Sequence, residues 1–138
     1  MEVLDRYGDI VRALQRRASQ LGLAVKPEYV PEDPQYPIIF TCTRSGEAEL
    51  CALIFLFVPG DLFFTSDIVS FVFERIRSMG GEGVSVLLLF DSKVLPRVER
   101  VLSSMGLDDH AQIAAYTFSG YGYSMDWELS EPQPAGEQ

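Results

Sequence analysis

Residues 50–58 constrain the fold more than any other stretch, because all nine of their side chains are apolar. Glu49 precedes this run, and Pro59-Gly60-Asp61 follows it. A strand that carries apolar side chains on both faces is normally buried on both faces. Nine residues are also too few to cross a bilayer, which takes about 20. The run therefore predicts a central strand in a sheet with helices packed on both sides.

Residues 84–90 form a second, nearly continuous apolar run. Between the two runs, residues 68–79 carry a wide apolar stripe at helical spacing, and residues 65–67 supply side-chain oxygens that can cap its first turn. Two strands joined through a helix are expected to be parallel and linked by a right-handed crossover. The sequence therefore predicts that residues 50–58 and 84–90 are adjacent, parallel strands.

The remaining elements follow from amphipathic spacing and shorter apolar runs. They are predicted helices at 3–21 and 95–105, and predicted strands at 23–30, 38–43 and 111–118. Pro27 cannot donate a ladder hydrogen bond, so the strand at 23–30 belongs at an edge. The predicted fold class is α/β: a single-domain mixed β-sheet flanked by helices, in the order αβββαβαβ, over residues 1–127. A disordered acidic tail is expected at 128–138.

The net charge of −9 is concentrated toward the C-terminus, because the last 31 residues carry six acidic side chains and no Lys or Arg. Non-specific affinity for nucleic acid comes mainly from Lys and Arg that neutralise phosphates, so this balance argues against a nucleic-acid partner. The first residues lack the basic start and apolar core of a secretory signal. We therefore expect a cytoplasmic protein that does not enter a membrane.

The two cysteines, Cys42 and Cys51, lie in strand-like runs on either side of a predicted turn at residues 44–47. Their sulfurs could lie close together on paired strands, but this depends on a register that the sequence leaves open. In a reducing cytoplasm, two buried free thiols are expected.

Polar side chains follow both central runs: Asp61 follows the first, and Asp91 and Lys93 follow the second. Ligands of open α/β sheets gather at the carboxyl ends of parallel strands. Two carboxylates beside an ammonium could hold a metal ion or act as acid and base, although Asp91 is equally well placed to cap the next helix. His110 is the only histidine, which excludes a metal site with two histidines. No cofactor is predicted.

The predicted order of elements over residues 3–118 resembles, in topology only, the core of the restriction-endonuclease-like superfamily, including its Mrr-like members. The resemblance implies metal-dependent hydrolysis by an acidic residue near the second strand and an acid-x-Lys motif on the third. Asp33 precedes the second predicted strand, and the third begins Glu49-Leu50-Cys51, with cysteine in place of the family's lysine. The missing lysine argues against hydrolysis of DNA or RNA. Members of the family that have lost catalysis often serve as structural subunits.

Aromatic residues are concentrated between positions 116 and 127, where five of the sixteen in the chain occur. They are Tyr116, Phe118, Tyr121, Tyr123 and Trp127. The aromatic residues stand at even positions before Ser119-Gly120 and at odd positions after it. Such a change of phase requires a bulge or a turn. We expect it to direct successive aromatics toward opposite faces, so that part of the stretch is exposed. Tyr and Trp are frequent interface anchors, so this stretch is a candidate partner-binding surface.

The first predicted helix supplies complementary charge, because Arg12 and Arg16 lie one turn apart on its outer face. Asp126 and Glu128 would favour a basic partner surface, such as this helix in a second copy. The sequence therefore predicts a non-catalytic protein-interaction or structural module, either a homodimer or a subunit of a larger assembly. Its expected contact residues are Tyr121, Tyr123, Trp127, Arg12 and Arg16. The alternative is a divergent metal-dependent nuclease or phosphoesterase.

Overall fold

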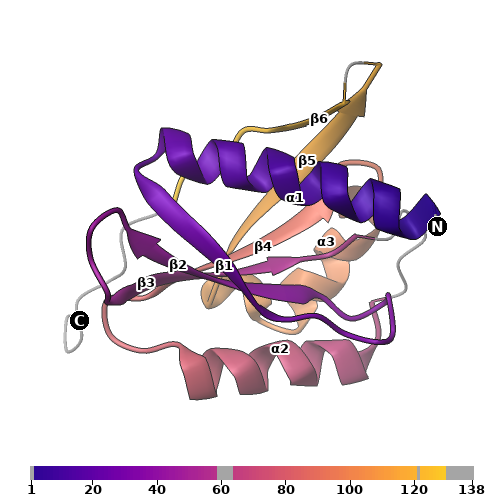
Figure 1. Ribbon diagram of the computed structural model, residues 1–138. Helices are drawn as coiled ribbons and strands as arrows, with labels where there is room; N and C mark the ends of the chain where they lie inside the picture. Colours follow the sequence, from indigo (N-terminus) through magenta and orange to yellow (C-terminus); the bar gives the residue numbers. More distant parts are fainter. Residues whose placement is uncertain (1, 59–63, 121, 130–138) are drawn as a thin grey trace.

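The computed structural model shows a mixed β-sheet with helices on both faces (Figure 1). It describes residues 2–58, 64–120 and 122–129, with side chains from residue 8 onward. Within these residues the elements are α1 (Glu2–Gln20), β1 (Leu23–Tyr29), β2 (Ile38–Arg44), β3 (Leu50–Leu56), α2 (Ser66–Met79), β4 (Ser85–Asp91), α3 (Leu95–Ser104), the 3-10 helix η1 (Leu107–Asp109), β5 (Gln112–Ser119) and β6 (Gly122–Met125). The predicted fold class is confirmed, with one strand more than the predicted order contains.

The six strands that the structure describes lie in the sheet in chain order, from β1 to β6. The pairs β1–β2, β2–β3 and β5–β6 are antiparallel, whereas β3–β4 and β4–β5 are parallel. The prediction that the two apolar runs form adjacent parallel strands is therefore confirmed. No described helix is both long enough and apolar enough to cross a membrane.

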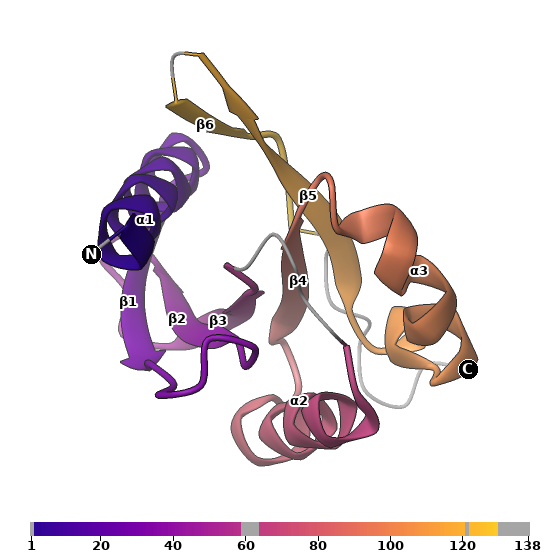
Figure 2. The ribbon, with the colours of Figure 1, turned by 90° about the vertical axis from the view of Figure 1, so that its right-hand side faces the viewer.

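Both faces of β3 are covered, as its apolar sequence requires. Ala52 and Ile54 pack into the core beneath α1, and Leu53 and Phe55 pack into the core beneath α2 and α3. These four side chains are fully buried. Figure 2 shows α1 on one side of the sheet and α2 and α3 on the other. The sheet curves around α1, which contacts both edge strands, β1 and β6.

The change of phase near Ser119 is produced by a hairpin turn. A turn is one of the two explanations predicted from the sequence, and a bulge is the other. Ser119 pairs with Gly122, and Phe118 pairs with Tyr123. Side chains of directly opposite residues in an antiparallel pair point to the same side of the sheet. Even positions of β5 therefore share a face with odd positions of β6. For the described aromatics of the hairpin, Tyr116, Phe118 and Tyr123, the expectation that they point toward opposite faces is wrong, because the turn reverses the parity of the facing positions.

Tyr116 joins β5 to the end of β3. Its side chain is fully buried, and its hydroxyl donates to the carbonyl oxygens of Phe57, at 2.7 Å, and Val58, at 3.2 Å. Replacing Tyr116 with phenylalanine would remove the hydroxyl, so the buried carbonyl groups of Phe57 and Val58 would lose this hydrogen-bond donor. We expect the free energy of unfolding to fall by about 1–3 kcal/mol, measured by urea denaturation.

Tyr36→Phe is the matched control, because the Tyr36 side chain is half-buried and its hydroxyl donates to no described residue. Its expected effect is within about 0.5 kcal/mol. Equal losses in the two variants would contradict a special role for the Tyr116 hydroxyl.

Candidate functional site

Only part of the polar site predicted at the carboxyl ends of the central strands, Asp91 and Lys93, falls within the described residues. Asp61 lies outside them. Asp91 is 6% exposed, and its Oδ1 accepts a hydrogen bond from the backbone N–H of Lys93 at 2.9 Å. The Asp91 carbonyl accepts from the N–H of Val94, also at 2.9 Å, whereas the Lys93 side chain is exposed. Asp91 therefore shapes the tight turn that leads into α3.

The order of the strands also bears on whether a binding crevice forms at this edge of the sheet. A binding crevice forms where neighbouring crossovers leave a parallel sheet in opposite directions, so that the strand order reverses. Here β3, β4 and β5 follow one another without reversal, and α2 and α3 cover the same face. No three described His, Cys, Asp or Glu residues are grouped so that they could hold a metal ion.

The acidic residues indicated by the nuclease resemblance also lie apart. Ile38 pairs with Leu56 and Thr43 pairs with Leu50, so the start of β2 and the start of β3 are at opposite ends of this antiparallel pair. Asp33 precedes β2, and Glu49 precedes β3. Five residues of strand separate the two ends by about 16 Å. The register therefore places the segment that follows Asp33 and the segment that follows Glu49 at opposite ends of the strand pair.

Trp127 belongs to the core rather than to an exposed surface. It is 2% exposed and packs with the buried side chains beneath α1. Its carbonyl oxygen accepts a hydrogen bond from Nε of Arg17 at 2.8 Å. The expectation that Trp127 is an exposed partner anchor is wrong, because the segment after β6 folds back against α1.

The acidic residues expected to meet a basic surface of a second copy, Asp126 and Glu128, lie near Arg17 of their own chain, and neither Arg12 nor Arg16 pairs with them. Nη2 of Arg17 lies 3.7 Å from a carboxylate oxygen of Asp126 and 4.0 Å from one of Glu128. Both acidic side chains are exposed, so these ion pairs contribute little to stability. Leu129 packs against the same core, so contacts with the domain continue past the predicted start of the tail. Residues 130–138 of that tail lie outside the described residues.

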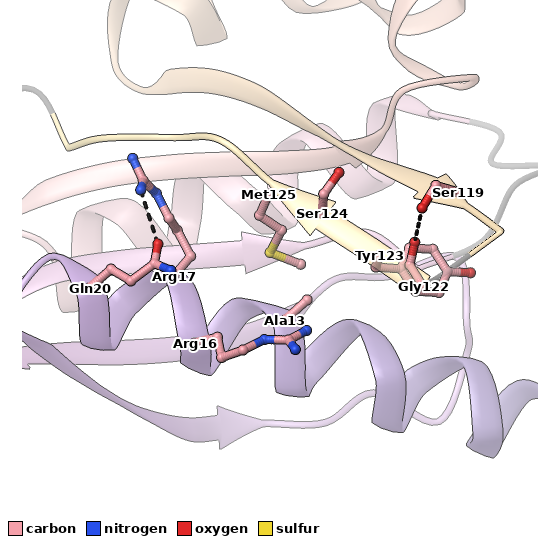
Figure 3. A pocket seen from close by; sticks show the side chains of 9 residues that line it. All are labelled: Ala13, Arg16, Arg17, Gln20, Ser119, Gly122, Tyr123, Ser124 and Met125. Carbon is pink, nitrogen blue, oxygen red and sulfur yellow. Dashed lines mark hydrogen bonds between the residues drawn. The ribbon is translucent and has the colours of Figure 1, made fainter.

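A cleft of about 350 Å³ lies between α1 and the β5–β6 hairpin (Figure 3). Its walls are Ala13, Arg16, Arg17 and Gln20 on α1, and Ser119, Gly122, Tyr123, Ser124 and Met125 on the hairpin. Two predicted contact residues, Arg16 and Tyr123, are thus brought together. Arg12 is exposed and pairs with Asp9 on its own helix, and Tyr121 lies outside the described residues.

Several polar groups of the cleft have partners within the chain. Arg17 also donates to Oε1 of Gln20, and the Ser124 hydroxyl donates to the Thr117 carbonyl. Arg16, in contrast, is exposed and forms no ion pair with any other described residue. Arg16 is therefore the charge that the cleft offers to a ligand.

Phe118 adds an apolar surface beside the cleft. It is 57% exposed, and its ring centroid lies 5.0 Å from that of Tyr123. Phe118 is not among the contact residues predicted from the sequence, because the alternation alone does not show that the hairpin extends beyond the cover of α1. Val30 and Met105 are the other large apolar side chains that are exposed among the described residues, and neither lines the cleft.

Comparison with protein-family models, curated protein sequences and solved structures finds no match for this chain.

Proposed function

We propose that this chain is a non-catalytic protein-interaction or structural module that works as a homodimer or as a subunit of a larger assembly. The observation that carries the proposal is the exposed Phe118 side chain, packed on Tyr123 beside a cleft that presents Arg16. Aromatic and arginine side chains are enriched among the residues that dominate binding energy at protein interfaces. The hairpin surface, defined as Phe118, Tyr123 and Arg16, combines both types.

The alternative, a divergent metal-dependent nuclease or phosphoesterase, has no comparable support. Asp33 and Glu49 stand at opposite ends of a strand pair, and Asp91 is engaged in its local turn. A hydrolytic site would need a set of ligands that converge on one point. The described residues favour the interaction module.

The homodimer is tested by measuring molar mass against protein concentration with sedimentation equilibrium. We expect a dimer that Phe118→Ser weakens by about tenfold, because association would bury an apolar side chain that the monomer exposes. Val30→Ser is the matched control, since Val30 is 58% exposed and lies beyond the opposite edge strand. It should leave the dissociation constant unchanged.

Equal weakening by both substitutions would contradict the assignment to the hairpin surface. A wild-type chain that stays monomeric at high concentration would overturn the homodimer. The proposal that the chain is a subunit of a larger assembly would then depend on finding that it binds another protein.

A further inference from the structure

The two edges of the sheet differ in how they are protected against strand pairing. At the edge formed by β1, Pro27 lacks an N–H, the pairing with β2 is irregular between Pro27 and Tyr29, and the flanking Lys26 and Glu28 are charged and exposed. Prolines, bulges and charged side chains are the features by which proteins prevent an edge strand from pairing with another chain. The β1 edge is therefore protected against pairing with another chain, and we call it blunted.

Within its own four residues the β6 edge carries none of these features, and the first charged side chain beyond it is the exposed Asp126. Residues Gly122–Met125 contain no proline and no charged side chain, and they pair with β5 without interruption. Alternate residues of an edge strand direct their backbone N–H and C=O groups away from its neighbour. The side of β6 that faces away from β5 is thus suited to pairing with a further strand.

The cleft lies along β6 and suits a single extended chain. Its volume of about 350 Å³ is at the small end of the range for ligand pockets, and α1 forms its opposite wall. An extended segment can lie along the strand edge and the facing wall at the same time, so that main-chain and side-chain contacts are both available to it. Arg16 projects from α1 (Figure 3) and forms no ion pair with another described residue. Exposed Phe118 pairs with Tyr123 near the turn of the hairpin. The cleft therefore combines a strand edge, a positive charge and an apolar surface.

We infer that β6 binds an extended, carboxylate-bearing segment of a partner protein, which adds to the sheet as a further strand. The inference rests on the proposed interaction function and specifies the chemistry of the partner. In strand addition, main-chain hydrogen bonds supply affinity, and alternate side chains supply specificity. Arg16 selects an Asp or Glu of the segment through a charge-assisted hydrogen bond, and Phe118 selects an apolar side chain.

The test uses a phage-displayed library of random dodecapeptides, selected on the immobilised full chain. The wild type should enrich peptides that combine Asp or Glu with β-branched or aromatic residues. The Arg16→Glu variant should enrich Lys or Arg instead, and a synthetic peptide selected on the wild type should bind this variant at least about tenfold more weakly. Arg100→Glu is the matched control, because Arg100 is exposed on α3, on the other face of the sheet. It changes the net charge equally and should leave binding unchanged.

Hydrogen exchange then distinguishes strand addition from side-chain contact alone. The bound peptide should slow exchange of backbone amides in Gly122–Met125, and amides of the blunted β1 edge should not change. Enrichment that does not depend on Arg16, or binding without protection of β6, would overturn the inference.

The inference and the proposed function can fail separately. One possible result is that no peptide is enriched but a dimer forms that Phe118→Ser weakens. The proposed function then stands, and the inference that β6 binds a carboxylate-bearing segment is wrong. If the wild type neither dimerises nor enriches peptides, both are wrong.

Discussion

Replacing Trp127 with alanine should lower the free energy of unfolding by about 3–5 kcal/mol, measured by urea denaturation of the full chain. Trp127 is 2% exposed, so its removal leaves a large space in the core beneath α1. Its carbonyl also receives the Arg17 hydrogen bond, so the loosened segment would weaken a second contact with α1.

Two matched variants make this prediction specific. Trp127→Phe keeps most of the apolar volume and removes an indole N–H that has no hydrogen-bond partner in the described part of the chain, so it should cost much less. Phe118→Ala removes a side chain that is 57% exposed and should change stability by less than about 1 kcal/mol. If Trp127→Ala costs no more than Phe118→Ala, the packing of the C-terminal segment against α1 is wrong.

The contrast between Trp127 and Phe118 shows what separates core from surface in this aromatic stretch. Both are large aromatics within twelve residues of each other, and both occupy the α1 side of the sheet. Trp127 lies where Arg17 and the end of α1 cover it, whereas Phe118 lies near the tip of the hairpin. Substitutions at Trp127 therefore report on folding, and substitutions at Phe118 report on association.

The central sheet could be predicted because its signal is local. Apolar side chains on both faces of residues 50–58 and 84–90 require cover on both sides, and one intervening helix requires a parallel connection. The contact surface could not be predicted in the same way. The face that each aromatic occupies depends on the pairing of Phe118 with Tyr123, and the burial of Trp127 depends on Arg17, 110 residues earlier.

The predicted site at Asp61, Asp91 and Lys93 shows a second limit. The rule that ligands gather at the carboxyl ends of parallel strands applies where the strand order reverses. Strand order is a property of the whole sheet, and the sequence of each strand does not reveal it. Because the described strands follow chain order, the rule gives no crevice beside Asp91.

The structure also answers the question of the two cysteines, whose relative placement the sequence left open. Cys42 pairs with Ala52, and Thr43 pairs with Leu50, so Cys51 is the extra residue of an irregularity in the β2–β3 ladder. Both cysteines therefore contact the core beneath α1. Cys42 is fully buried, and Cys51 is half-buried.

Burial raises the pKa of the Cys42 thiol from 9.0 to about 12, and the neighbouring Cys51 acts in the same direction. The thiolate is the form that reacts with alkylating agents, so a rise of this size lowers the reactive fraction of Cys42 at pH 8 by roughly 1000-fold. Burial also raises the pKa of Cys51, but its half-buried thiol remains accessible. With iodoacetamide, time-resolved peptide mass spectrometry should therefore show alkylation of Cys51 well before Cys42.

Alkaline unfolding provides an independent measure of the same thiol. Because the folded state holds the Cys42 proton more tightly than the unfolded state, this group's contribution to stability is full below about pH 9. It is lost as the pH rises toward about 12, by about 1.4 kcal/mol per pH unit. Cys42→Ala should remove this part of the alkaline decline, whereas Cys51→Ala should change it less. Alkylation of Cys42 as fast in the folded as in the urea-unfolded chain, with the same alkaline decline in Cys42→Ala, would show that β2 does not bury this thiol.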